Sequence, residues 1–161
     1  MAIWQVDLKL APKDKLNTKD SIENLEFSSL WSRYNISKDS IEEVGKVLKR
    51  TDSWSNDIVQ LGDISSNVIE LFFEEGNISE VTCRLDLRNL NIEIMDTILR
   101  FIWANDLAVI VDNRAYMEIN REVLVDIIKK SEAYRFINDP EVFLELLGKC
   151  TGCGTELKLK R

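Results

Sequence analysis

The sequence predicts an α+β fold, in which a mainly antiparallel sheet of about five to six strands is covered by three to four helices. Short segments alternate apolar and polar residues, turn-forming residues join them, and longer segments repeat apolar residues at helical intervals. The composition is 45% hydrophobic, which is typical of a folded chain. We expect residues 1–149 to form a single α+β domain and residues 150–161 to form a short basic tail that contains cysteines.

The first third of the chain is expected to contain one strand and one clear helix. Residues 1–10 place apolar side chains at alternate positions, which predicts a strand. Residues 11–36 follow neither period, so we expect a loop there with one short helix. Ser40 and Glu43 have the spacing of a capping box, and apolar residues at helical intervals predict a helix over residues 38–50.

A change to a period of two predicts an antiparallel meander in the middle of the chain. The expected strands are residues 57–61, 67–75 and 79–88, with a turn at Gly76-Asn77 between the last two. Alternation divides residues 79–88 into a buried and a charged face. The buried face would carry Val81, Cys83, Leu85 and Leu87, and the charged face Thr82, Arg84, Asp86 and Arg88.

The C-terminal part of the chain is expected to supply the core helix and the remaining covering helices. Asparagine caps and an Asp-Pro pair indicate where these helices begin. The side-chain oxygen of a cap accepts a hydrogen bond from a free N–H of the first turn, and proline at the first helical position has no N–H to satisfy. In chain order we expect a helix over residues 91–105 capped by Asn91, strands over 107–111 and 116–119, a helix from Asn120 through Tyr134, and a helix from Asp139-Pro140 to Gly148.

The absence of histidine restricts the function more than any other feature of the sequence. Without histidine there is no Ser-His-Asp or Cys-His nucleophile, no histidine general base and no zinc site of the common catalytic kinds. The sequence also contains no P-loop, no Gly-x-Gly-x-x-Gly and no Gly-x-Ser-x-Gly. We therefore expect a protein with no catalytic residues, no cofactor and no bound metal, rather than an enzyme.

The distribution of charge indicates the kind of partner. The net charge is −7, and residues 61–145 carry seventeen acidic but only eight basic side chains. Such a field repels nucleic acid and acidic lipid and accelerates encounter with a basic protein. We expect neither nucleic acid nor a membrane as partner, and the sequence leaves the oligomeric state open.

The pattern at the start of the chain and the cysteine content predict the compartment. The alternation over residues 1–10 differs from the continuous apolar stretch of a secretory signal, and no segment is apolar over the length of a membrane span. The three cysteines are an odd and sparse set, which favours free thiols in a reducing compartment. We expect a cytoplasmic protein.

The candidate partner-binding residues are carboxylates of the meander and two tryptophans in irregular segments. The carboxylates could converge as a docking surface or as an acid/base or Mg²⁺ pair, or form only a solvated face. Trp4 and Trp103 are expected in the core, whereas one of the other two tryptophans could be an exposed anchor. The candidates are Glu70, Glu74, Glu75, Glu80, Asp86, Trp31 and Trp54.

A Cys-x-x-Cys-Gly pattern at Cys150 and Cys153 supports an alternative function. This pattern resembles one knuckle of a zinc ribbon, in which two thiolates bind one metal. A complete site needs further ligands, and the remaining thiol, Cys83, is expected on a buried strand face. The alternative is therefore a small metal-binding or regulatory module, beside the simpler interpretation of the segment as a solvent-exposed tail or a redox pair.

Three segments, WQVD at the N-terminus, EGNISEVTCRLDLR in the meander and SEAYRFINDPEVFLELL near the end, resemble small bacterial immunity proteins. These acidic proteins act against toxins of contact-dependent or polymorphic toxin systems. The resemblance implies one-to-one capture of a basic toxin domain, such as a nuclease, by an acidic surface that blocks its active site or substrate groove. Other possibilities are strand addition at a sheet edge, an enzyme that uses only carboxylates and lysines, or a subunit of a larger enzyme.

Overall fold

The computed structural model describes residues 2–16, 22–142 and 144–145 of the chain, and within them seven strands form one antiparallel sheet. The strand order is β2-β3-β4-β5-β1-β6-β7, so β1 lies between two later strands. The strands are β1 (Gln5–Pro12), β2 (Arg50–Thr51), β3 (Ile58–Gly62), β4 (Val68–Glu74), β5 (Asn77–Asp86), β6 (Leu107–Val111) and β7 (Arg114–Tyr116).

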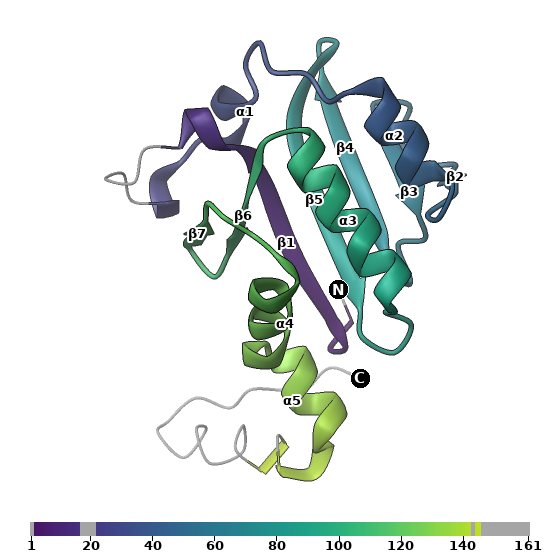
Figure 1. Cartoon of the computed structure of the whole chain (residues 1–161), viewed down its shortest axis with the longest axis vertical. Coiled ribbons are helices and arrows are strands. Elements are labelled where there is room, and N and C mark those ends of the chain that lie inside the picture. The colour runs from purple at the N-terminus through teal and green to yellow at the C-terminus, as the bar shows by residue number, and fades with distance from the viewer. Residues whose placement is uncertain (1, 17–21, 143, 146–161) are drawn as a thin grey trace.

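Helices lie mainly on one face of this sheet. Figure 1 shows α2 and α3 in front of the strands, with α4 and α5 below them. The helices are η1 (Lys13–Lys15), η2 (Ile22–Asn24), α1 (Phe27–Leu30), α2 (Lys38–Gly45), α3 (Ile92–Ala104), α4 (Arg121–Lys130) and α5 (Glu132–Asn138). The predicted α+β class is confirmed, with one strand more than the expected range; the short edge strand β2 was not expected.

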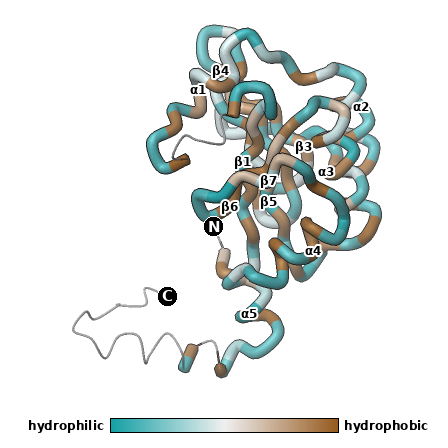
Figure 2. Tube along the Cα trace, turned by 60° about the vertical axis from the view of Figure 1, so that its left-hand side comes forward, coloured by the Kyte–Doolittle hydropathy of each residue, from teal (hydrophilic) through white to brown (hydrophobic). Residues whose placement is uncertain are grey.

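The main core lies between the sheet and the helices. Alternation along β1, β4 and β5 turns one set of apolar side chains toward α3, as the period of two predicts. Cys83 is fully buried on this face, as expected, and α3 contributes Ile98, Leu99 and Phe101. Figure 2 shows this arrangement as hydrophobic colour along the central strands and hydrophilic colour in most of the turns.

A smaller apolar layer covers part of the second face of the sheet. Ala11 of β1, Ile110 of β6 and Leu30 of α1 form its buried centre. The next residue, Trp31, belongs to the main core instead, so the chain passes from one face of the sheet to the other at this point. The expectation that Trp31 could be an exposed anchor is wrong, because the side chain is fully buried and packs edge-on against Tyr34 at 5.8 Å.

The positions of the other tryptophans also differ from expectation. Trp103 was expected in the core, but its side chain is 54% exposed and donates a hydrogen bond from Nε1 to the Ile119 carbonyl at 2.7 Å. Trp4 is half-buried, with the Arg88 guanidinium 4.0 Å above its ring. Trp103 is thus held at the surface by its hydrogen bond, whereas Trp4 is held by the cation–π contact with Arg88 while its own Nε1 is buried without a partner among the described residues.

The C-terminal helices begin at the predicted caps but end differently. Asn120 accepts a hydrogen bond from the Val123 N–H, and Asp139 accepts one from the Val142 N–H before the helical residues that start at Pro140. The single helix expected through Tyr134 is wrong: Ser131 has extended backbone angles and caps the separate helix α5. The predicted end at Gly148 lies outside the described residues.

No helix in the described ranges has both the length and the apolar character that crossing a membrane requires.

Candidate functional site

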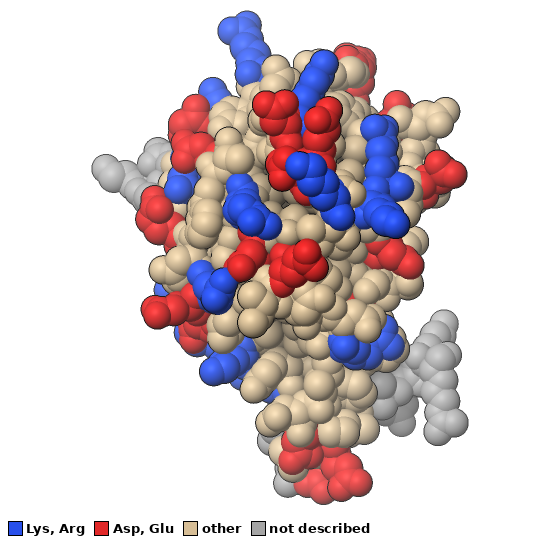
Figure 3. All heavy atoms as spheres, turned by 45° about the vertical axis from the view of Figure 1, so that its right-hand side comes forward, with Lys and Arg blue, Asp and Glu red and all other residues tan. Residues whose placement is uncertain are grey.

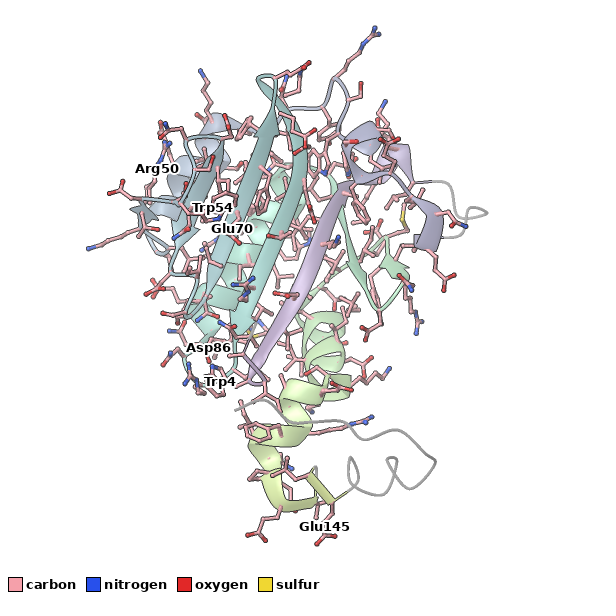
Figure 4. All side chains as sticks on the ribbon, turned by 180° about the vertical axis from the view of Figure 1, so that it is seen from behind. Trp4, Arg50, Trp54, Glu70, Asp86 and Glu145 are labelled. Atoms are coloured by element: carbon pink, nitrogen blue, oxygen red, sulfur yellow. The ribbon has the colours of Figure 1, made fainter. Side chains whose placement is uncertain are left out.

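The second face of the sheet carries polar side chains where the small apolar layer ends. Figure 4 looks onto this face, with β3, β4, β5 and β1 in front of the helices. The strand register places Gln60 beside Glu70, Glu70 beside Thr82, and Thr82 beside Lys9. We call the outward side of β3, β4 and β5, together with residues 5–9 of β1, the uncovered half of the sheet.

Glu70 lies at the centre of the uncovered half and is almost completely buried, with 6% of its surface exposed. Its carboxylate has no hydrogen-bond or ion-pair partner within the described part of the chain. Burial removes water from this group and raises its pKa; Arg84 lowers the pKa and Asp7 raises it. The carboxylate oxygens still reach the surface, since they are not among the fully buried atoms that lack a partner in the described residues, but partial burial without a donor is unfavourable for the ionised group and makes Glu70 a candidate for contact with a partner.

The cations near Glu70 are bound to other acceptors. Arg84 donates from Nε to Asp7 at 3.1 Å and from Nη1 to the Ile64 carbonyl at 3.2 Å. Lys9 forms an ion pair with Glu80 at 3.1 Å and lies 4.5 Å above the Phe27 ring. The neighbouring Gln60 is equally buried, but its amide nitrogen donates to Thr51 and to the Gly62 carbonyl. Glu70 is thus the charged group of this row that has no ion pair or hydrogen bond with a described residue.

Four exposed carboxylates lie at one end of the uncovered half, and we call them the acidic rim: Asp52, Asp57, Glu74 and Glu75. The first two belong to the loop between β2 and β3, Glu74 is the last residue of β4, and Glu75 belongs to the turn between β4 and β5. A hydrogen bond of 2.8 Å from the Phe73 N–H to the Asp57 carbonyl joins the loop to β4. No carboxylate of the rim forms an ion pair with any residue whose position is described.

Trp54 lies in the same loop, between the two aspartates of the rim. Its side chain is 80% exposed, the largest exposure among the large hydrophobic residues of the described ranges. In Figure 4 it lies toward the β3 edge of the uncovered half, with Glu70 nearer the middle. An exposed tryptophan beside unpaired carboxylates is the composition expected of an interface centre with a charged border.

The turn of the rim borders an open cavity that is lined by described residues. Glu75 and Gly76 have positive φ angles of 50° and 81°, which places the two-residue turn at these positions, one residue before the expected Gly76-Asn77. Such a turn needs the left-handed conformation that glycine adopts easily. The cavity is about 800 Å³ and is lined by Asp57, Glu74, Glu75 and Arg33, among others.

The opposite side of the molecule has a different charge pattern. Figure 3, turned toward α2 and α3, shows acidic and basic side chains interleaved over its upper part. Ion pairs of α2 and α3 include Glu43 with Lys46 and Asp96 with Arg121. Exposed pairs of this kind contribute little net field because each charge is offset by its neighbour. Other exposed carboxylates on this side, such as Asp39, Glu42 and Glu93, also lack ion pairs with described residues, so the rim is distinguished by its position beside Trp54 rather than by unpaired charge alone.

The seven candidates from the sequence separate into three groups. Glu70, Glu74, Glu75 and Trp54 lie on or beside the uncovered half, Glu80 lies at its margin in a pair with Lys9, and Trp31 and Asp86 are buried.

The expectation that Asp86 is exposed on the charged face is wrong. Its carboxylate is fully buried and accepts hydrogen bonds from Arg88 Nε at 3.0 Å, Arg88 Nη2 at 2.7 Å and Asn89 Nδ2 at 3.3 Å. Hydrogen bonding from the Arg88 side chain is the main reason that the pKa of Asp86 is lowered. Asp86 thus anchors the end of β5 and is not part of a surface.

Sequence reasoning missed the loop that carries Asp52 and Asp57. The pattern Asp52-Ser-Trp54-Ser-Asn-Asp57 was a usable signal, because a tryptophan between two acidic residues in a turn-forming segment is rarely a core position. Gln60 could not have been selected in the same way, since its role depends on pairing with β4.

The cysteines add no site within the described residues. Burial raises the pKa of the Cys83 thiol far above its usual range, so this thiol is neither a ready nucleophile nor a metal ligand. No group of three or more potential metal-ligating side chains occurs in the part of the chain that the structure describes. Cys150 and Cys153 lie outside it, and the metal-binding alternative stays a prediction.

Comparison of the chain with protein-family models, with curated proteins and with solved structures finds no significant match.

Proposed function

We propose that this protein is a cytoplasmic immunity protein, which captures a basic toxin domain one-to-one and neutralises it through the uncovered half of the sheet. The observation that supports this most strongly is Trp54, an almost fully exposed tryptophan that lies between the unpaired carboxylates of the acidic rim. Exposing so large an apolar side chain to water is unfavourable unless a partner covers it.

The charges of the site affect which partners associate with it and how fast they do so. The rim has four carboxylates that are not offset by ion pairs with described residues, on a protein whose net charge is −7. A field of this sign accelerates association with a basic surface and disfavours acidic partners. A toxin domain that binds nucleic acid has such a basic surface, and an acidic rim that covers its substrate groove would block access to it.

The capture is tested by a tagged pull-down from the native host, at low and at high salt, with Trp54→Ala beside the wild type. We expect a stoichiometric basic protein that the wild type retains at high salt, and an affinity lower by about 2 kcal/mol for the variant, or roughly thirtyfold. Trp103→Phe is the matched control, because it changes a tryptophan that is also exposed but lies on α3.

Two results would contradict the proposal. One is that no stoichiometric partner is retained although the neighbouring genes are expressed. The other is that Trp54→Ala and Trp103→Phe bind the recovered partner equally well, which would place the interface elsewhere. Neutralisation itself is measured as survival of cells that produce the captured protein with and without this chain.

A further inference from the structure

We propose that Glu70 is the receptor for an arginine side chain of the partner, so that a guanidinium group occupies the centre of the uncovered half. This inference rests on the proposed function and gives it a specific contact. Its basis is the geometry around Glu70, a residue whose surface is 94% buried and whose surface-reaching carboxylate has no hydrogen-bond or ion-pair partner among the described residues.

The position of Glu70 favours an incoming side chain over solvent. It lies on the third of seven strands, flanked by Gln60 on β3 and Thr82 on β5, and it therefore sits inside the sheet face rather than at its margin. A free carboxylate at a margin would be hydrated. At this position neighbouring side chains cover most of the residue, but its acceptor oxygens still reach the surface, where a charged donor would satisfy them.

Neighbouring groups add acceptors rather than donors. The amide nitrogen of Gln60 is used by Thr51 Oγ1 at 2.7 Å and by the Gly62 carbonyl at 3.3 Å, so its amide oxygen remains as an acceptor. Together with the carboxylate, this oxygen gives a set of acceptors that matches a ligand with several N–H groups. A guanidinium has five such donors and no acceptor.

Apolar side chains beside Glu70 favour arginine over lysine. Phe72 follows Glu70 on the same side of β4, and the register places Ile58 of β3 directly beside Phe72. A flat, weakly hydrated guanidinium packs on such a surface while it forms two parallel bonds to a carboxylate. A compact, strongly hydrated ammonium does this less well.

The cations of the chain itself do not occupy the position. Arg84 is the cation with an electrostatic effect on Glu70, but its guanidinium is held by Asp7 and by the Ile64 carbonyl. The loop between β3 and β4 keeps it there, because Gln5 also donates to the Ile64 and Ser66 carbonyls. The arginine that pairs with Glu70 is therefore supplied from outside.

The test uses the full chain and a fluorescein-labelled oligoarginine peptide, with oligolysine and oligocitrulline peptides of equal length. Binding is measured by fluorescence anisotropy at neutral pH and about 0.15 M salt, where nonspecific attraction is screened. Glu70→Gln preserves shape and removes the charge. Glu122→Gln is the matched control, since Glu122 is an exposed glutamate on α4 that changes the net charge by the same amount.

We expect Glu70→Gln to weaken oligoarginine binding about tenfold and to abolish the preference for oligoarginine over oligolysine, whereas Glu122→Gln changes it less than about twofold. Equal affinities of the two variants, no binding of oligoarginine by the wild type, or an equal dependence of oligolysine on Glu70 would each overturn the inference.

The two proposals can fail separately. If Glu70→Gln binds the captured partner as tightly as the wild type while Trp54→Ala does not, the protein-binding function stands and the arginine site is wrong. If the peptide shows the expected dependence on Glu70 but no partner is captured, the site stands and the proposed function is wrong.

Discussion

Glu70 and Asp86 are both buried carboxylates of the β4–β5 hairpin, yet their surroundings shift their pKa values in opposite directions. The pKa of Glu70 is raised, chiefly because burial removes water and no donor replaces it. The pKa of Asp86 is lowered, chiefly because Arg88 donates hydrogen bonds to the carboxylate. The same type of side chain therefore opposes folding in one place and supports it in the other at neutral pH.

Glu70→Gln should stabilise the protein at neutral pH. The folded pKa of Glu70 lies above its ordinary value of 4.5, so the wild type loses free energy of unfolding as the pH rises through the window above about 4.5. The variant has no carboxylate to ionise at this position. We therefore expect its free energy of unfolding at pH 7 to exceed that of the wild type by about 1 kcal/mol, and this difference should disappear under acidic conditions. Urea unfolding between pH 4 and pH 8 measures it, with Glu122→Gln as the control. Greater stability of the wild type at pH 7 would show that Glu70 has a favourable partner within the chain.

Asp86→Asn should have the opposite effect. The lowered pKa means that the stabilisation by Asp86 is fully present above its ordinary value of 3.8 and is lost as the pH falls below that value. We expect the variant to lose about 2 kcal/mol at pH 7, because bonds from Arg88 and Asn89 to a charged acceptor are weakened. The difference from the wild type should shrink below pH 4 in acid-unfolding curves. Asp7→Asn, at an exposed pair with Arg84, should cost less than about 1 kcal/mol.

Among the helices, α2 and α3 are joined by one buried side chain, Asn105, at the C-terminal end of α3. Its amide nitrogen donates to Ser40 Oγ at 2.8 Å and to the Phe101 carbonyl at 2.8 Å, and its amide oxygen accepts from the Ser37 N–H at 2.8 Å. One residue thus ends α3 and fixes the start of α2. The position of α2 over β3 depends on this link.

Asn105→Ala should therefore cost more than the loss of an ordinary helix cap. We expect about 3 kcal/mol, since the buried hydroxyl, N–H and carbonyl groups that Asn105 satisfies would lose their partner. Asn91→Ala, which removes the N-cap of α3 at its exposed end, should cost about 1 kcal/mol. Chemical denaturation of the two variants gives the comparison. Equal losses would indicate that water replaces Asn105.

Most elements that depend on local chemistry could be predicted from the sequence, whereas those that depend on packing could not; the capping box expected at Ser40 and Glu43 is wrong, because Ser37 caps the helix. The caps at Asn91, Asn120 and Asp139 occur where expected, because a cap needs only a side-chain oxygen near free N–H groups. The break at Ser131 was missed, since serine is tolerated in helices and the break allows Ala133 to reach the core.

The candidate site shows the same division. Alternation predicted which side of β5 holds Val81, Cys83 and Leu85. The burial of Glu70 was not predictable, because it arises from pairing with β3 and β5 and from the side chains that these strands bring beside it. Trp31 and Trp103 were misplaced for a related reason: burial of a ring depends on the face of the sheet that the chain reaches.

At the scale of the whole molecule, the acidic rim should control how fast the partner binds. We expect Glu74→Lys with Glu75→Lys to lower the association rate constant about tenfold at low salt, with a smaller difference at high salt. Glu122→Lys with Glu132→Lys makes the same change in net charge on α4 and α5 and should slow association less. Stopped-flow measurements with the captured partner distinguish the two pairs. Equal slowing would show that net charge alone steers the encounter.

The sheet ends in very short strands, β2 with two residues and β7 with three, and this shortness has a consequence for self-association. A long free edge presents a row of N–H and C=O groups on which another chain can extend the sheet, and such growth has no natural end. Edges of two and three residues provide too few bonds to start it. We therefore expect the protein to present the uncovered half of its sheet to one partner without polymerising into fibres through copies of itself.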